Sequence, residues 1–260
     1  MRELMHGLKE ANNRRQFMAD FMGEPLLIDL EDFTPESLEL AEMFTDRPFA
    51  QVDAVFASAD VQKDRYVFMI AEWNKRSDLF HIVMMQDVER TRGEFDSHMR
   101  LVDRVMAFAP EVTSQDVRYD KDQVMKNILD AGIENWIPVM GSSMEMTFNK
   151  PLVMSEREGI RTLATDEAKD VWRDLMERRA ITATADPSLL PRDFVEQLTA
   201  EERVHVAHRG MVKPMWKKTR QRNEALDLIV YIICECRRFM FDNPDYSRAD
   251  EEAYWSVMAE

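Results

Sequence analysis

Three aspartates occupy positions from which a folded chain could gather them around a metal ion. Asp60 ends a predicted strand over residues 52–60, and Asp120 ends another over 116–120. If these two strands are adjacent and parallel, both acids lie at the edge of the sheet where ligands usually bind. Asp227 opens an otherwise apolar predicted helix, where an aspartate is rarely buried unless it is paired or bound.

Such a group of acids is suited to divalent cations. Crowded carboxylates repel one another and raise one another's pKa, and a bound Mg²⁺ or Mn²⁺, which prefers oxygen ligands, removes that cost. Two such ions about 4 Å apart can activate a water molecule and stabilise the leaving oxygen of a phosphodiester. Acids at strand ends are also common as plain loop residues, so each position alone is a weak signal.

Three nearby acids are further candidates. Asp64 and Asp122 are either auxiliary ligands or ordinary loop residues. Glu224 lies three residues before Asp227 on the same helical face, where it is either another ligand or a residue that favours the helix start through the dipole. Other chemistry is poorly supported: the five histidines are scattered, the two cysteines lack partners for zinc, and no Gly-x-Ser-x-Gly motif is present.

Positive charge is concentrated in one stretch of an acidic chain. The formal net charge is -15, which argues against a general nucleic-acid coat. Residues 203–223, however, hold seven Lys or Arg and no Asp or Glu, and 203–218 form a predicted hairpin. This run is either a solvated surface or a contact for DNA phosphates. The candidate DNA-binding residues are Arg209, Lys213, Lys217, Lys218, Arg220 and Arg222.

The order of predicted elements indicates an α/β fold. Strands over 52–60, 65–73 and 79–85 form an antiparallel meander. Helices and strands then alternate, with helices over 96–109, from about 122, 166–179 and 222–239, strands over 116–120, 136–140 and 161–165, and a long polar loop over 141–159. This pattern favours a mixed sheet with helices on its faces.

Length and composition favour one large domain with appendages. The 260 residues are 45% hydrophobic and 32% charged, as in a globular protein with a core. We expect a helical arm or linker over 1–49, a main domain over 50–240 and a polar tail over 241–260. No run approaches the ~18 apolar residues that span a bilayer, and no P-loop motif for an ATPase is present.

Four segments, in order over about residues 17–238, match a recognisable pattern. They are Phe21–Pro25, Ala59–Asp64, Thr165–Asp170, and Phe194–Glu202 followed by Arg222–Asp227. Through them the chain resembles the nuclease portion of the large terminase subunit of tailed double-stranded-DNA phages, of the lambda-like type. The segments are modest individually and fairly specific together.

The resemblance implies an RNase H-like fold with helices on both faces and an endonuclease that uses two divalent cations to cut concatemeric DNA during packaging. It makes Asp60 the first-strand acid and Asp227 the C-terminal acid. Asp120 is the expected middle ligand, but the family has Asp followed by Ser-Gly where this chain has Asp120-Lys121-Asp122. The middle ligand is therefore either Asp120 or Asp122.

The resemblance also implies partners and a location. These are double-stranded DNA, the portal protein, the small terminase subunit and an ATPase motor, at the procapsid in the host cytoplasm, with no membrane. The motor is expected before residue 1, so the chain is either a fragment or a protein without a motor of its own. Two other functions stay open: a non-catalytic acidic docking module of the packaging motor, and an RNase H-like recombinase or resolvase.

Overall fold

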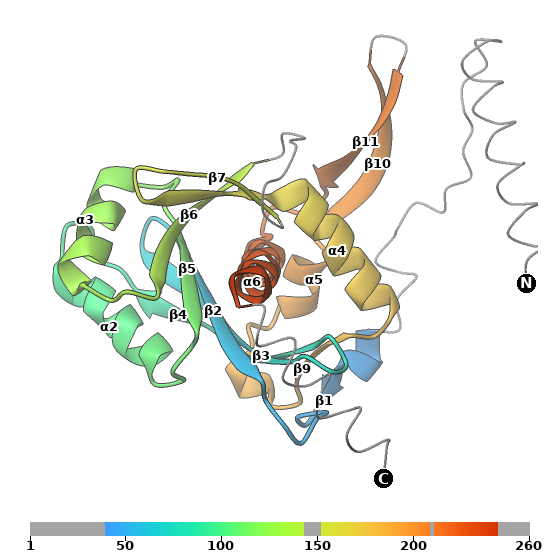
Figure 1. Ribbon diagram of the computed structural model, residues 1–260, viewed down its shortest axis with the longest axis horizontal. Helices are drawn as coiled ribbons and strands as arrows, with labels where there is room; N and C mark the ends of the chain where they lie inside the picture. The colour runs from blue at the N-terminus through green and yellow to red at the C-terminus, as the bar shows by residue number, and fades with distance from the viewer. Residues whose placement is uncertain (1–39, 143–151, 209–210, 244–260) are drawn as a thin grey trace, which may run out of the picture.

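The computed structural model describes residues 40–142, 152–208 and 211–243, which form a mixed sheet, a separate hairpin and helices on both sheet faces (Figure 1). The sheet strands are β1 (Phe44–Thr45), β2 (Ala54–Val61), β3 (Arg65–Asn74), β4 (Leu79–Glu89), β5 (Val112–Asp116), β6 (Trp136–Ser142), β7 (Val153–Arg157), β8 (Ile160–Ala164) and β9 (Ile181–Thr184). The hairpin strands are β10 (Glu201–His208) and β11 (Met211–Lys218). The helices are α2 (Phe95–Met106), α3 (Lys121–Ala131), α4 (Thr165–Glu177), α5 (Phe194–Leu198) and α6 (Glu224–Asp242), with short 3-10 turns η2 (Leu40–Met43) and η3 (Pro187–Leu189).

The strand order across the sheet is β1-β9-β4-β3-β2-β5-β6-β8-β7. Strand β3 is antiparallel to both β2 and β4, while β5 is parallel to both β2 and β6. The central order β4-β3-β2-β5-β6, with only β3 reversed, is the RNase H-like arrangement. The predicted antiparallel meander followed by parallel strands is therefore confirmed. The parallel pairing of β2 with β5 also meets the condition under which acids at their ends would lie at one edge.

Helices cover both faces of the sheet, as predicted (Figure 1). Helices α2 and α3 lie on one face, over a buried cluster that includes Phe68 and Leu101. Helices α4, α5 and α6 lie on the other, over a larger cluster that includes Phe56, Trp172 and Ile229. Because both faces are covered, β2 and β3 are almost continuously apolar, and α6 is buried nearly all round.

Some predicted boundaries are wrong. The strand predicted over 116–120 is β5, which spans Val112–Asp116 and carries four buried polar residues, Thr113, Ser114, Gln115 and Asp116. Buried polar residues do not give the apolar signal that reveals a buried strand. The loop predicted over 141–159 contains β7, and residues 143–151 lie outside the described part of the chain.

The predicted appendages are only partly visible. Residues 1–39 and 244–260 lie outside the described residues, so the arm and the tail stay predictions over those ranges. The described end of the predicted arm contributes β1, which pairs in parallel with β9 at the sheet edge. Helix α6 continues to Asp242, past the predicted end at residue 239. Within the described ranges, no helix is long and apolar enough to cross a membrane.

Candidate functional site

Two aspartates leave the sheet at the same end of neighbouring parallel strands. Ala59 of β2 is paired with Gln115 of β5, so Asp60 and Asp116 follow at the next position on each strand. Asp116 is 3% exposed, and Asp60 is partly exposed. Because carboxyl ends of adjacent parallel strands face a common crevice, this register brings the two carboxylates to one place.

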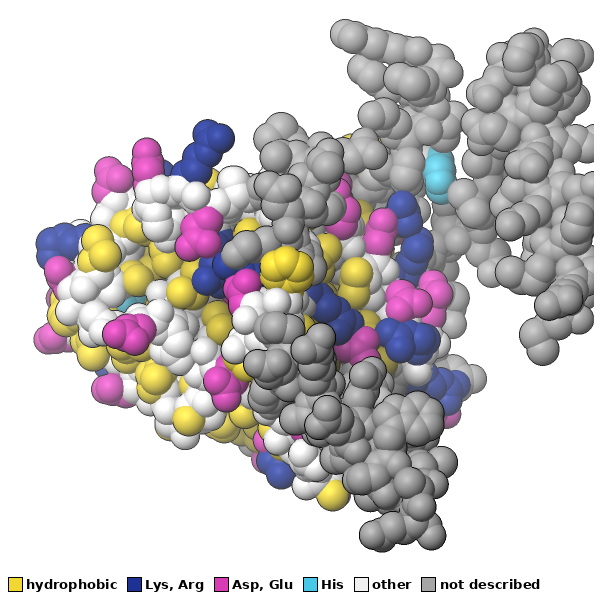
Figure 2. Space-filling view, in the orientation of Figure 1, with side chains coloured by type: hydrophobic (Ala, Val, Ile, Leu, Met, Phe, Trp, Pro, Cys, Tyr) yellow, Lys and Arg dark blue, Asp and Glu magenta, His cyan; other side chains and the backbone are white. Residues whose placement is uncertain are grey.

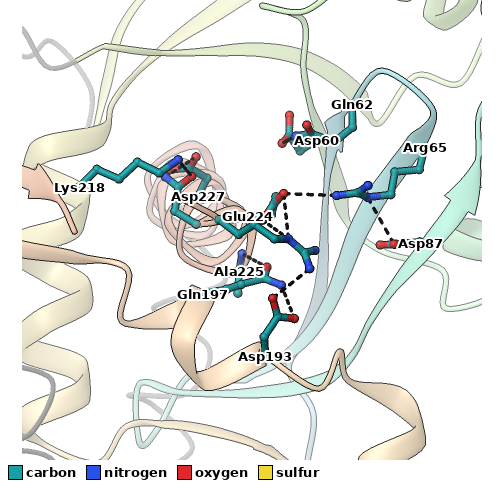
Figure 3. A network of polar contacts seen from close by, with 12 residues as sticks. Asp60, Gln62, Arg65, Asp87, Asp193, Gln197, Lys218, Glu224, Ala225 and Asp227 are labelled. Carbon is teal, nitrogen blue, oxygen red and sulfur yellow. Dashed lines mark hydrogen bonds and ion pairs between the residues drawn. The ribbon is translucent and has the colours of Figure 1, made fainter. Parts of the chain in front are cut away.

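The third aspartate comes from the first turn of α6, which is fixed against β2. The Ser58 hydroxyl donates a buried hydrogen bond of 2.9 Å to the carbonyl of Leu228, which locks the helix start onto the strand that carries Asp60. The side-chain oxygen of Gln197 accepts from the backbone N–H of Ala225 at 3.3 Å and so satisfies a free donor of the helix N-terminus. Figure 3 shows Asp227 on this turn, with Asp60 on the neighbouring strand.

The three aspartates line one polar pocket of about 290 Å³. Its other lining residues are Val61, Gln62, Arg118, Tyr119, Lys218, Gln221, Asn223 and Glu224. The predicted residues Asp60 and Asp227 are thus brought together. Asp120 is absent from this lining, and Asp116, four residues earlier, is present instead.

The electrostatics of the pocket reflect crowded carboxylates. Burial and the neighbouring Asp116 raise the pKa of Asp60 to about 6, against the pull of Gln62 and Arg118. Burial raises the pKa of Asp227 to about 7, with Glu201 and Asp60 adding to the rise, against the attraction of Lys169 and Arg118. Burial and neighbouring acids therefore disfavour the charged form of both carboxylates, and a nearby cation would stabilise that form.

A buried ion pair supports Asp227 from behind. Lys169 of α4 donates from Nζ to Oε2 of Glu201 at 2.7 Å, and both side chains are at most 9% exposed. The Asn223 amide donates to Oε1 of Glu201 and to Oδ2 of Asp227, each at 3.0 Å. Lys218 of the hairpin donates to Oδ1 of Asn223 at 2.7 Å. This chain of contacts fixes the orientation of the Asp227 carboxylate.

Asp116 is held by two residues. The Tyr231 hydroxyl, fully buried one turn after Asp227, donates to Asp116 Oδ2 at 2.6 Å. The backbone N–H of Arg118 donates to Oδ1 at 2.7 Å, and its Nε donates to Oδ2 at 2.8 Å. Sequence reasoning missed Asp116 because the strand boundary was placed four residues late. The signal that could have found it is the polar run 113–116, which itself ends on an acid.

Asp120 belongs to a different contact group. It is the N-cap residue of α3, at a φ of 59°, and its carboxylate pairs with Arg90 at 2.6 Å and Arg92 at 3.2 Å. These hydrogen bonds, led by that from Arg90, hold its pKa below the usual value. Arg90 is itself pinned by the Gln62 carbonyl at 3.1 Å and lies over the Tyr119 ring. The structure therefore does not place Asp120 with Asp60 and Asp227.

The remaining candidate acids are divided between surface and pocket. Asp64 has a side chain that is 77% exposed and lies 3.6 Å from Arg65, and Asp122 is exposed on the first turn of α3. Neither lines the pocket. Glu224 does line it, but is paired with Arg65 at 3.5 Å (Figure 3) and with Arg222 at 3.3 Å.

Four of the six candidate DNA-binding residues have described side chains, and these lie at the hairpin base and in the segment after it. Lys217, Lys218 and Arg220 are exposed, and Lys218 reaches the pocket. Arg222 is paired with Asp193 at 2.9 Å. Arg209 and the side chain of Lys213 lie outside the described part of the structure. Acidic and basic side chains are interspersed on the face shown in Figure 2.

The donor set fits a divalent cation in chemistry. Three carboxylates supply the oxygen ligands that Mg²⁺ and Mn²⁺ prefer, and two of them have a raised pKa. In the described ranges, no three His, Cys, Asp or Glu side chains already stand in an arrangement that could hold a metal ion. Each pocket aspartate instead bonds to a protein neighbour: Asp60 to Gln62, Asp116 to Arg118, and Asp227 to Asn223.

The fold and the site together define an RNase H-like domain with a carboxylate pocket at the carboxyl ends of β2 and β5. Residues 8–245 match the family described as "Terminase large subunit gpA, endonuclease domain". The chain belongs to this family.

Relatives of known identity agree. The chain is 24% identical over 284 aligned positions to the terminase large subunit of Enterobacteria phage P21, with 95% of this chain and 43% of that protein covered. It is 28% identical over 124 positions to the terminase large subunit of Escherichia phage lambda, covering 41% of this chain and 18% of that protein. The chain thus spans less than half the length of these relatives.

Similar solved structures include three phage nuclease domains. That of the large terminase subunit gp2 of bacterial virus Sf6 is 10% identical, with a TM-score of 0.47 over 72% of this chain and 90% of that one. That of bacteriophage SPP1, described with bound Mn, is 13% identical, with a TM-score of 0.44 over 73% and 90%. That of P22 is 16% identical, with a TM-score of 0.44 over 77% and 92%.

Proposed function

We propose that this domain is a metal-dependent endonuclease that hydrolyses phosphodiesters of double-stranded DNA. The observation that supports the proposal most strongly is the pocket of Asp60, Asp116 and Asp227 in a member of the terminase endonuclease family. These three carboxylates are the proposed ligands of two divalent cations, Mg²⁺ or Mn²⁺. Asp116 replaces Asp120 and Asp122 as the proposed middle ligand, because neither of those lines the pocket.

The protein groups have separate tasks in this proposal. Bound divalent cations would supply an activated water molecule and stabilise the leaving oxygen. Tyr231 orients Asp116 through its hydroxyl, and the Asn223 amide orients Asp227. Glu224 serves as the partner of Arg65 and Arg222 rather than as a ligand.

DNA approaches from the hairpin side. Lys217, Lys218 and Arg220 are exposed there, and Lys218 lines the pocket, so these side chains are the proposed phosphate contacts. Arg209, Lys213 and Arg222 stay predictions from the sequence. Affinity that depends on Lys and Arg contacts to phosphates falls steeply with salt. A net charge of -15 opposes binding elsewhere on the surface, so the domain alone is expected to bind DNA weakly.

The proposed biological task is cutting concatemeric phage DNA during genome packaging. It is supported by the family and by the P21 and lambda relatives, which are terminase large subunits. The proposed partners are an ATPase motor, the portal protein and the small terminase subunit, at the procapsid in the host cytoplasm.

The test is a plasmid-nicking assay with the purified chain in Mn²⁺, in Mg²⁺ and in EDTA. The proposal predicts cleavage with either metal, none in EDTA, and none in Asp60→Asn. A Holliday junction and a linear duplex of equal length are compared in the same buffer. Cleavage restricted to the junction would instead identify a resolvase, and an unreactive protein that binds no divalent cation would identify a docking module.

A further inference from the structure

The guanidinium of Arg118 occupies the carboxylate pocket. Its Nη2 lies 2.7 Å from Asp116 Oδ2 and donates to the Tyr231 hydroxyl at 2.8 Å. Together with its Nε and backbone N–H, Arg118 engages both oxygens of Asp116. Its charge also acts on the carboxylates of Asp60 and Asp227. An arginine remains charged at any working pH, so the pocket contains a permanent positive charge.

Arg118 differs in exposure from Arg90, the buried one of the two arginines that pair with Asp120. The Arg118 side chain is 54% exposed, whereas that of Arg90 is 1% exposed and is pinned by the carbonyls of Gln62 and Lys63. Water can hydrate the half-exposed guanidinium when it moves away, whereas the buried carboxylate of Asp116 then needs another cation in its place. A buried arginine cannot leave without losing its hydrogen bonds.

We propose that Arg118 is a built-in competitor of the divalent cation for Asp116. In the metal-free domain its guanidinium takes the lone pairs of Oδ2 that a metal ion needs, and metal binding displaces it from that oxygen. The proposal rests on the assignment of Asp116 as a ligand. It makes Arg118 a residue that sets metal affinity through its contact with Asp116. Among the described hydrogen bonds, the Arg118 side chain makes none to Asp60 or Asp227.

The experiment is calorimetric titration of the full chain with Mn²⁺, comparing wild type with Arg118→Gln. Removing the competitor is expected to tighten Mn²⁺ binding at least about 10-fold, the lower end of what one hydrogen bond to a charged group contributes. The matched control is Arg92→Gln, since Arg92 is also an exposed arginine on an aspartate but pairs with Asp120. Its Mn²⁺ affinity is expected to equal that of wild type. Arg118→Gln is also expected to lower the Tm in EDTA, where it leaves the carboxylates uncompensated.

A second comparison tests whether the effect passes through Asp116. In an Asp116→Asn background, Arg118→Gln is expected to change Mn²⁺ affinity by less than 2-fold. Equal or weaker Mn²⁺ binding by Arg118→Gln than by wild type would overturn the competitor proposal and leave the proposed nuclease standing. Binding by Arg118→Gln alone, with none by wild type, would support it. No Mn²⁺ binding by either protein, with both folded by circular dichroism, would overturn both proposals.

Discussion

Two groups of acids flank the loop after β5, and they differ in how their charge is balanced. Around Asp120, two arginines satisfy one carboxylate and lower its pKa. In the pocket, Asp60 and Asp227 lie close to Asp116. The pKa of Asp60 is raised to about 6 and that of Asp227 to about 7. The first group resembles an ordinary structural ion pair, and the second is a site that gains from a cation. Asp116 ends β5 and Asp120 caps α3 four residues later, and the charge balance around each distinguishes the proposed metal ligand from the acid paired with arginines.

The largest expected effect is the loss of cleavage on removing a pocket carboxylate. Asp116→Asn is expected to reduce Mn²⁺-dependent nicking at least about 100-fold, because an amide is a poor replacement for a ligand carboxylate. Asp120→Asn is the matched control, since it removes the same charge four residues away, and is expected to cut within about 3-fold of wild type. Wild-type cleavage by Asp116→Asn together with lost cleavage in Asp120→Asn would contradict the division into two groups. Initial rates on supercoiled plasmid give the measurement.

Next in size is the buried support of Asp227. Lys169→Met leaves Glu201 buried without its partner, so it is expected to destabilise the domain by about 3–5 kcal/mol. Urea unfolding followed by circular dichroism measures the loss. Lys217→Met, at an exposed position, is the control and is expected to change stability by less than about 0.5 kcal/mol. A Lys169→Met protein as stable as the control would show that the pocket does not depend on this ion pair.

A smaller effect is expected at Asp120. Asp120→Asn weakens its contacts with the buried Arg90, and the free energy of unfolding is expected to fall by about 1–2 kcal/mol. Asp227→Asn, in contrast, is expected to raise the stability of the metal-free protein at pH 8, since it removes a carboxylate with a raised pKa. If Asp120→Asn lowers the stability in EDTA and Asp227→Asn raises it, the two groups of acids differ as described. If both variants change the stability in the same direction, they do not.

The smallest expected effect is on the pH dependence of stability. A folded-state pKa of about 7 means that Asp227 holds its proton more tightly in the folded chain than in the unfolded one. Stability in EDTA is therefore expected to fall by roughly 1 kcal/mol as pH rises from 6.5 to 8, and Asp227→Asn is expected to remove most of that slope. Below pH 6.5 the buried His98, with a pKa lowered by burial to about 4, acts in the opposite sense. A wild-type Tm that rises over pH 6.5–8 in EDTA would contradict the assignment.

The fold was largely predictable because its signals are local. The apolar runs of β2 and β3 and the helical periodicity of α2 and α4 appear directly in the sequence. Strand β5 was misplaced because its buried residues Thr113 to Gln115 are polar. The short edge strand β1 could not be predicted, since its pairing depends on β9, far along the chain.

The site was half predictable for the same reason. Asp60 and Asp227, two predicted residues that line the pocket, each adjoin a clear apolar element of the sequence. The choice between Asp116 and Asp120 depends on Arg90 and Arg92, from the segment after β4, and on Tyr231 of α6. The spacing of residues along the sequence does not show which acid pairs with which arginine. Charge balance at a site is therefore a property of the tertiary structure.

The most direct test of the central claim is the anomalous difference map of a crystal soaked in Mn²⁺. The account predicts density among the carboxylates of Asp60, Asp116 and Asp227, with Asp120 still paired to Arg90. Mn²⁺ density at Asp120 or Asp122, with none between Asp60 and Asp116, would contradict it.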